Sequence, residues 1–236
     1  MFSPLALLAL SGLASAIPAI SARGPYPRAT CDQSANNVTK ESYTILYDDD
    51  IFTISNKTGV GACDIARYNK LADAYSLTPG FDILIPEQIC EPDNTSCLLE
   101  DDEPLSDCVI GGPHTYTTIA NDTIAKVALT KFHVTIDSLT SQISDEAGSF
   151  RNAWTVLTTG TTLKIPQCAP SQCIIQPYHF TYGTYKDLAA EVGATVGQLY
   201  AFNPTYNISI SGPGTGPILT IPFNCTLLSS NYTVES

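Results

Sequence analysis

The stretch YTTIANDTIAKVA, residues 116–128, combines a strand-like start with a helix-like end. Its first half is rich in Tyr, Thr and Ile, and aromatic and β-branched residues favour extended backbone. Its second half contains strong helix formers with apolar residues on one face. Between the halves lies Asn121-Asp122-Thr123, whose short side chains favour a turn and accept the free N–H groups of a first helical turn. The stretch therefore predicts a strand, a capped turn and a helix that begins near Ile124.

The same order of elements occurs in two other parts of the chain. Strand-like segments ending in Ile-Pro lie at 82–86, 162–166 and 218–222, and each is followed by a cysteine within four residues. Reading backwards from each ending gives a loop, two short helices and an opening aromatic strand. The expected helices lie at 51–55 and 61–69, at 124–128 and 134–143, and at 186–192 and 194–204. This repetition predicts three units of an α+β fold, each with two helices on one face of a two-stranded antiparallel sheet.

The cysteine content points to an oxidising compartment. The chain has eight cysteines: Cys31, Cys63, Cys90, Cys97, Cys108, Cys168, Cys173 and Cys225. An even count of this kind predicts four disulfides, whose connectivity stays open. A metal site is disfavoured because no CxxC pair occurs and the three histidines are scattered, so we expect neither metal nor cofactor. Units this small bury little apolar surface. We therefore expect the disulfides to supply stability and to fix one unit against another.

The N-terminus and the sequons agree with secretion. Residues 2–22 carry no charge and contain an apolar run that ends in small residues, which predicts a signal peptide over residues 1–22. Predicted N-glycosylation sites are Asn37, Asn56, Asn94, Asn121, Asn207, Asn224 and Asn231. The sequence thus indicates a glycosylated extracellular protein.

The charge of the chain limits its partners. The formal net charge is −12 at pH 7. Nucleic acids and anionic membranes would be repelled, whereas a neutral ligand meets no electrostatic penalty.

At these motifs the chain resembles the LysM family. The opening YTxxxNDTIxxVA at 116–128 is similar to the start of a LysM domain, and TVGQLYAFNP at 195–204 is similar to its second helix and the Asn-Pro that follows. Departures are the turn at 48–50, the turn at 182–184, and Ile143 where Asn is usual. Three units with a signal peptide and eight cysteines resemble the secreted LysM effectors of fungi. The implied domains are a signal peptide at 1–22, LysM units at 43–90, 114–168 and 177–225, an acidic linker at 91–113, and a linker at 169–176.

The resemblance implies a binding site in each unit. In this family the turn before the first helix and the loop after the second form a shallow groove for N-acetylglucosamine oligomers. The residues assigned to the grooves are Asp48, Asp49, Asp50, Ile51, Leu71, Ala72 and Asp73 in the first unit, Asn121, Asp122, Thr123, Ile124 and Trp154 in the second, and Gly183, Thr184, Tyr185, Pro204, Thr205, Tyr206 and Asn207 in the third. The first and third units are expected to close around one oligomer, and a bound oligomer could bridge two copies of the protein.

The implied function is non-catalytic. Sequestration of chitin fragments would hide them from host receptors, and coating of the hyphal wall would protect it from chitinases. The acidic runs at 48–50 and 101–103 read as solvated loops and not as a glycosidase carboxylate pair, and no GxSxG or HExxH motif occurs. The alternative is a cell-wall recognition glycoprotein that binds glycan weakly and acts through a protein partner. Peptidoglycan shares the N-acetylglucosamine unit, but the eukaryotic secretion features favour chitin.

Two predicted site residues have competing interpretations. Asn121 is either the acceptor of a glycan that blocks the second groove or an unmodified turn residue. Trp154 is either a core residue or a sugar platform.

Overall fold

The fold is taken from a computed structural model of the chain. It describes residues 38–88, 90–100, 104, 106–111, 115–141, 152–206 and 216–235. The predicted signal peptide at 1–22, together with Cys31, Asn37, Asn207 and the acidic residues 101–103, lies outside this part of the chain. Among the described residues, no helix has both the length and the apolar character needed to cross a bilayer.

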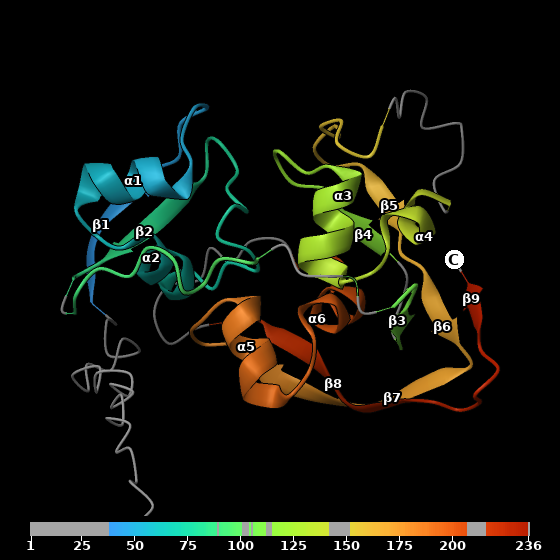
Figure 1. The fold of residues 1–236 in the computed structure, drawn as a ribbon. Coiled ribbons are helices and arrows are strands. Elements are labelled where there is room, and N and C mark those ends of the chain that lie inside the picture. Colours follow the sequence, from blue (N-terminus) through green and yellow to red (C-terminus); the bar gives the residue numbers. More distant parts are fainter. Residues whose placement is uncertain are drawn as a thin grey trace, which may run out of the picture. The chain divides into compact units, whose positions relative to one another are not determined.

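The first unit has the predicted order of strand, helix, helix and strand (Figure 1). Its elements are β1 (Thr39–Thr44), α1 (Ile51–Thr58), α2 (Ala62–Tyr68) and β2 (Asp82–Pro86), and β1 pairs antiparallel with β2. Helix α1 begins where the Asp50 carboxylate accepts the Thr53 amide at 2.6 Å. It ends at Gly59, whose φ of 72° suits glycine. The unit has its own apolar core, which includes Ile51, Ile54 and Ile85.

The second unit keeps this order but distorts its first helix. Its elements are β4 (Thr115–Thr117), α3 (Ile124–Lys126), η2 (Val127–Phe132), α4 (Ile136–Ser141) and β5 (Thr162–Lys164), with β4 antiparallel to β5. The helix predicted at Ile124 is confirmed, and Thr123 caps it by accepting the Lys126 amide. From Val127 the helix widens into a π-helix, which inserts one extra residue and rotates the side chains that follow. The rotation matters for Lys131, as described below.

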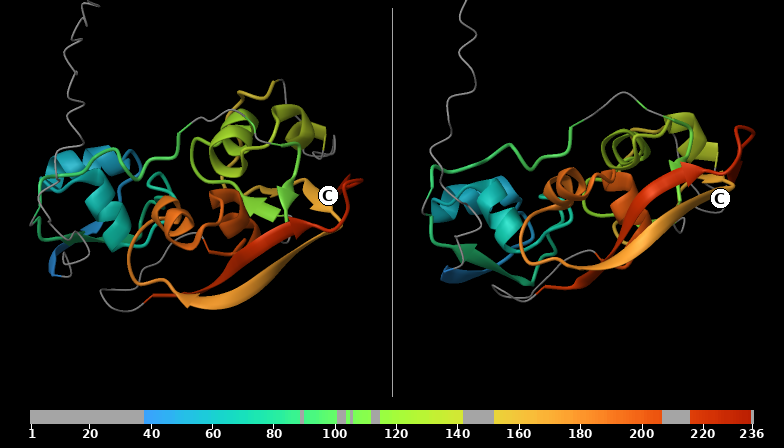
Figure 2. Two further views of the ribbon diagram at one scale, coloured as in Figure 1. Left: turned by 60° about the horizontal axis from the view of Figure 1, so that its bottom comes forward. Right: turned by 90° about the horizontal axis from the view of Figure 1, so that it is seen from below.

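The third unit is built on a longer hairpin. Its elements are β7 (Ser171–His179), α5 (Tyr185–Val192), α6 (Val196–Phe202) and β8 (Ile218–Leu227), with β7 antiparallel to β8. Figure 2 shows both helices on one face of this twisted ribbon. Thr184 and Thr195 each form a capping box, in which the threonine and the residue three positions later exchange hydrogen bonds. Residues 171–176, which the sequence places in a linker, form the start of β7.

The structure contains one more sheet, which the sequence pattern did not predict. Strands β3 (Val109–Ile110), β6 (Gln167–Ala169) and β9 (Thr233–Glu235) pair in the order β3-β6-β9, with β3 parallel to β6 and β6 antiparallel to β9. The sheet is thus formed by segments that flank the units. These segments are too short to give a readable strand pattern.

The second and third units share one core. Phe132 and Tyr116 of the second unit pack with Tyr200 of the third at ring-centroid distances of 5.4 to 5.9 Å. Gly197 of α6 lies so close to η2 that an added Cβ would stand 3.0 Å from the Cα of Phe132. The two units therefore form one packed body through their helices.

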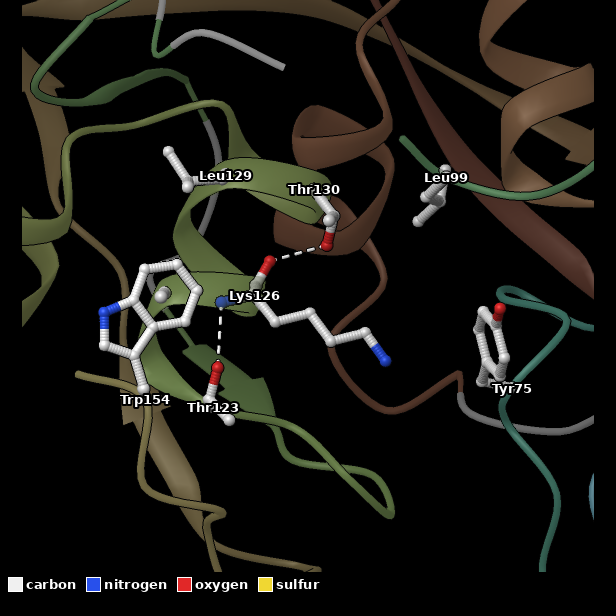
Figure 3. A pocket seen from close by; sticks show the side chains of 8 residues that line it. Tyr75, Leu99, Thr123, Lys126, Leu129, Thr130 and Trp154 are labelled. Carbon is white, nitrogen blue, oxygen red and sulfur yellow. Dashed lines mark hydrogen bonds between the residues drawn. The ribbon is translucent and has the colours of Figure 1, made fainter. Parts of the chain in front are cut away.

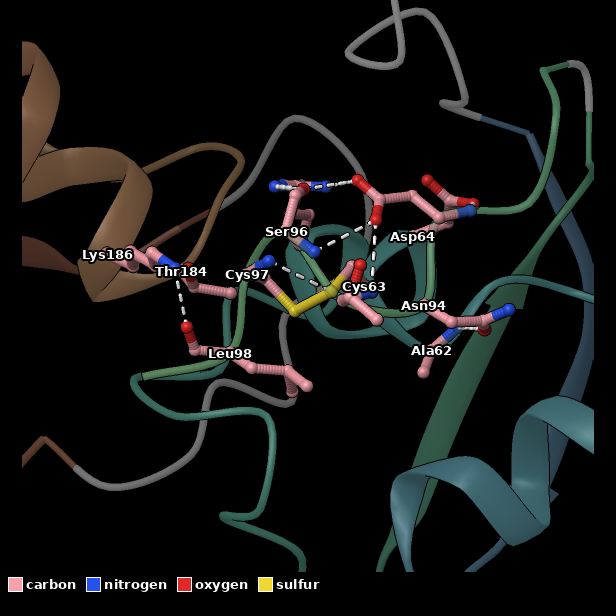
Figure 4. Close-up of a disulfide and its surroundings, with 12 residues drawn as sticks. Ala62, Cys63, Asp64, Asn94, Ser96, Cys97, Leu98, Thr184 and Lys186 are labelled. Atoms are coloured by element: carbon pink, nitrogen blue, oxygen red, sulfur yellow. Dashed lines mark hydrogen bonds and ion pairs between the residues drawn. A yellow bond between two sulfur atoms is a disulfide. The ribbon is translucent and has the colours of Figure 1, made fainter. Parts of the chain in front are cut away.

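No disulfide between described residues joins two different units, contrary to the expectation from the sequence. Among the described residues the bridges are Cys63–Cys97, Cys108–Cys168 and Cys173–Cys225, and Cys90 is also disulfide-bonded. Cys63–Cys97 ties α2 to the segment after β2, where the Asn94 side chain also accepts the Ala62 amide at 2.8 Å (Figure 4). Cys63–Cys97 and Cys108–Cys168 each fasten a unit to its own flanking segment, and Cys173–Cys225 joins the two strands of the third unit's hairpin.

Candidate functional site

The turn before the first helix is held by the same three residue types in the first and second units. In the first unit, Asp49 accepts hydrogen bonds from Tyr43 at 2.7 Å, from the Leu46 amide at 2.9 Å and from Lys57 at 2.6 Å. Burial raises the pKa of Asp49, but these hydrogen bonds outweigh it and hold the pKa below its usual value. Asp49 therefore shapes the turn and its side chain is only 2% exposed.

Asp122 has the same role in the second unit. Its carboxylate accepts hydrogen bonds from Tyr116 at 2.6 Å and from the Ile119 amide at 2.8 Å, and the Lys131 ammonium lies 3.4 Å away. Burial, with Tyr200 and Asp122 nearby, raises the pKa of Tyr116 far above its usual value, so the phenol stays a donor. The extra residue of the π-helix places Lys131 where Lys57 stands in the first unit.

The third unit lacks this acidic turn residue. Gly183 occupies the turn with a φ of 109°, and the Thr184 amide donates to Asp187 at 2.8 Å. Tyr178 donates instead to Glu191 at 3.0 Å.

Half of the predicted binding residues that the structure describes are buried. Buried are Ile51, Leu71, Ala72, Asp73, Asp122, Ile124, Gly183, Thr184 and Tyr185, partly buried are Asp49, Thr123, Pro204 and Tyr206, and exposed are Asp48, Asp50, Asn121, Trp154 and Thr205. The side chains that stay exposed at these segments are therefore mostly polar, and the Trp154 indole is the one ring among them.

The structure brings the predicted segments of the first and third units together. The Tyr185 amide donates to the Ala72 carbonyl at 3.3 Å, and the Gly183 amide donates to the Arg67 carbonyl at 3.0 Å. The Tyr206 hydroxyl donates to the Lys70 carbonyl at 2.5 Å. The turn and loop of the third unit thus face the loop after α2 of the first.

Arg67 fastens this contact, and the sequence interpretation missed it. Its guanidinium donates to both carboxylate oxygens of Asp187 at 2.9 and 3.0 Å, to Asp93 at 2.9 Å and to Ser96 at 2.8 Å. Burial lowers the pKa of Arg67, but its two carboxylate partners outweigh burial and raise it. A single arginine on a predicted helix does not indicate, from the sequence, that its partners lie as far away in the chain as Asp187.

A second buried cation was also missed. Lys131 is fully buried, and its ammonium lies 3.1 Å from Asp73 of the first unit and 2.6 Å from the Tyr116 hydroxyl. The ring centroid of Tyr200 in the third unit is 5.6 Å away. This group, which we call the Lys131 cluster, comprises Lys131, Asp73, Asp122, Tyr116 and Tyr200 and draws a side chain from every unit. Its members give no joint pattern in the sequence.

Trp154 lies at the rim of a cavity of about 410 Å³. Figure 3 shows its indole on one side of Lys126, whose side chain points toward the ring of Tyr75. The indole is 65% exposed, so the interpretation of Trp154 as a core residue is wrong.

The described sequons differ in their surroundings. Asn56, Asn94, Asn121, Asn224 and Asn231 are all exposed. Asn121 has a φ of 63°, which asparagine tolerates better than most residues, and this explains why it fills a glycine-like turn position.

Comparison with known proteins identifies the family. A family model described as LysM domain matches residues 43–86, which are the first unit. The chain is 44% identical over 228 residues to the protein named Secreted LysM effector LysM13 of Penicillium expansum, with 96% of both chains covered. It is 32% identical over 203 residues to Secreted LysM effector ECP6 of Passalora fulva, covering 84% of this chain and 83% of that relative. A shorter match to Secreted LysM effector ELP2 of Colletotrichum higginsianum has 41% identity over 97 residues, 41% of this chain and 53% of the relative.

The 44% identity over 96% of the chain, the order of elements in the first unit and the disulfides all point to the same family. The chain belongs to the family of secreted LysM effectors.

Proposed function

We propose that this protein binds chitin oligosaccharides without cleaving them, and that all three units are LysM modules. Family membership and the match at 43–86 support the first module. The second and third have the same strand, helix, helix and strand order. The module boundaries would be those given by the sequence, at 43–90, 114–168 and 177–225, with the third hairpin extending into the segment before it.

The observation that carries this proposal is the meeting of the first and third units. Gly183 and Tyr185 direct their backbone amides at carbonyls of the first unit. An N-acetylglucosamine oligomer carries acetamide groups that can accept from such amides, and its ring faces suit Tyr206. An oligomer entering between the units would exchange inter-unit hydrogen bonds for bonds to its own acetamides. Two half-grooves on one polymer also raise affinity through effective concentration.

The carboxylates support binding more than catalysis. Glycoside hydrolysis needs an acid and a base that face one bond across a cleft. In the run at 48–50, the Asp49 carboxylate accepts the Leu46 amide within its own turn, and the Asp50 carboxylate accepts the Thr53 amide at the start of α1. The other acidic run, at 101–103, lies outside the described residues.

Calorimetric titration of the secreted glycoprotein with N-acetylglucosamine oligomers tests binding and gives its stoichiometry. A pull-down on chitin beads, with cellulose and xylan beads as controls, tests the polymer. Heat on mixing and selective retention on chitin are expected. Absence of both would overturn the proposal and favour a recognition protein that acts through a protein partner, while shortened oligomers after incubation would reveal catalysis.

A double-mutant cycle on the binding free energy tests whether the first and third units share one groove. Ala72→Gln alters the first unit's loop and Tyr206→Ala the third unit's ring, with Tyr232→Ala as a remote exposed control. If both line one groove, the double variant should lose less binding free energy than the sum of the single losses. Additive losses, in variants whose melting temperatures show that they fold, would indicate independent sites.

The biological role follows from binding. Sequestered oligomers are hidden from host receptors, and a coated wall is protected from chitinases. A host-cell assay of chitin-triggered oxidative burst and a hyphal chitinase assay, each with and without the protein, separate the two roles.

Binding at the second unit's groove depends on whether Asn121 is glycosylated. A glycan on the exposed Asn121 would lie on the turn beside Thr123 and block oligomer access. Peptide mapping after enzymatic deglycosylation decides this, since an unchanged mass at Asn121 removes the block.

A further inference from the structure

The turn before the first helix is covered in the third unit, whereas the corresponding turns of the other units keep exposed residues. Gly183, Thr184 and Tyr185 are all buried. In the first unit Asp48 is exposed at this turn, and in the second unit Asn121 is exposed. The cover comes from the first unit, whose backbone after α2 is hydrogen-bonded to the third unit's turn.

Two backbone amides of the covered turn already have acceptors. The Gly183 amide donates to the Arg67 carbonyl at 3.0 Å, and the Tyr185 amide donates to the Ala72 carbonyl at 3.3 Å. These are the donors that the proposed function offers to the acetamide of a sugar. The folded chain thus satisfies its own binding donors, and an oligomer reaches them only when the two units separate at this turn.

Charged side chains next to the turn hold the same contact. The Arg67 guanidinium of the first unit donates to both carboxylate oxygens of Asp187 in the third unit, at 2.9 and 3.0 Å. The Lys186 ammonium donates to the Leu98 carbonyl at 2.6 Å (Figure 4). Lys186 and Asp187 lie in the first turn of α5, directly after the covered turn. We call Arg67, Leu98, Lys186 and Asp187 the Arg67 latch.

The first unit presents its half of the latch on a rigid base. Arg67 also donates to Asp93 at 2.9 Å, and the Asp93 carbonyl accepts the Cys63 amide at 2.8 Å. The disulfide Cys63–Cys97 ties the segment before Leu98 to α2. Because this base is fixed within the first unit, separating the two units at the turn breaks the latch.

We propose that the Arg67 latch is an autoinhibitory contact, which keeps the shared groove of the first and third units shut until an oligomer opens it. This proposal rests on the proposed function, because it concerns the access of an oligomer to that groove. A binding-competent state that is only fractionally populated reduces the apparent affinity by that fraction. Weakening the latch should therefore tighten binding, although none of its side chains is among the residues assigned to the groove. A contact that only supported the fold would instead lose binding when weakened.

Binding kinetics of the glycoprotein on an immobilised chitin oligomer test the latch. Asp187→Asn removes a charge but keeps the side-chain shape, and it should speed association about tenfold, which corresponds to about 1.4 kcal/mol. Lys186→Met loses one bond to a neutral carbonyl and should give a smaller increase. The matched controls are Asp137→Asn, exposed in the first turn of α4, and Lys164→Met, exposed on β5, and both should leave association unchanged.

Two further measurements distinguish opening of the latch from a general loss of structure. The oligomer is uncharged, so salt acts on association only through the protein, and rising salt should speed association of the wild type more than that of Asp187→Asn. Without oligomer, the Gly183 and Tyr185 amides should exchange hydrogen faster in Asp187→Asn, while the amides of β2 keep their protection. Melting temperatures show whether each variant is folded.

The outcomes separate this proposal from the function on which it rests. Unchanged or slower association in folded Asp187→Asn and Lys186→Met would overturn the latch and leave chitin binding intact. Unchanged hydrogen exchange at Gly183 and Tyr185 in Asp187→Asn would also overturn it. Absence of binding by the wild type and by every variant would overturn the proposed function, and the latch with it.

Discussion

Replacing Lys131 by methionine should destabilise the protein more than any surface lysine change. The substitution keeps the length and apolar stem of the side chain but removes a fully buried ammonium. Asp73 and Asp122, whose carboxylates lie 3.1 and 3.4 Å from that ammonium, would stay buried without a cation.

The magnitude follows from burial. Removing one partner of a buried ion pair costs about 3–5 kcal/mol because the remaining charge is uncompensated. Asp122 keeps its hydrogen bonds from Tyr116 and the Ile119 amide, and Asp73 keeps one from the Tyr75 amide. These retained bonds place the expected loss toward the lower end, about 3 kcal/mol in the free energy of unfolding.

The first unit supplies the control. Lys57→Met removes the equivalent cation beside Tyr43 and Asp49, but Lys57 is 43% exposed and water can reach the ammonium. Urea denaturation at pH 7 should show a clearly smaller loss for Lys57→Met. Adding Asp73→Asn to Lys131→Met should recover part of the stability. Equal losses for both lysine variants, or no recovery in the double variant, would refute the reasoning from burial.

The other predictions concern stability and acid sensitivity. Cys63→Ala with Cys97→Ala opens a bridge of sequence separation 34 and should cost about 2–5 kcal/mol in chemical denaturation; an unchanged midpoint would contradict a stabilising bridge. Thr184→Ala removes a capping box from α5 and should cost about 1 kcal/mol, which thermal unfolding would detect; no change would mean that the cap is compensated. Burial raises the pKa of Asp93, but hydrogen bonds from Ser96, Thr95 and Arg67 outweigh burial and hold the pKa below its usual value. Asp93 therefore contributes stability above about pH 4 that is lost as the pH falls toward its lowered folded-state pKa. Melting temperature against pH should fall less steeply in acid for Asp93→Asn, and identical slopes would exclude Asp93 as a source of acid sensitivity.

The local elements of each unit were predictable because their signals are local. Ile-Pro endings, aromatic strand openings and Asp50, Thr123 and Thr184 at helix starts act over a few residues, so the strands and helices of the units follow from the sequence. The turns to which the resemblance assigns the grooves followed in the same way, because their position is fixed by their neighbours in the chain. The resemblance to LysM proteins rests on these local motifs.

The relations between distant segments were decided only by the tertiary structure. The sequence interpretation relied on disulfides to connect the units, but the described bridges stay within a unit and its flank. The connection comes from the core shared by the second and third units, from Arg67 and from the Lys131 cluster. Burial of a lysine at that point depends on a π-helix that shifts its register by one residue and on a carboxylate 58 positions away in the chain. Such contacts leave no periodic trace in sequence, because a side chain's energy depends on which groups surround it after folding, and neighbours along the chain do not specify those groups.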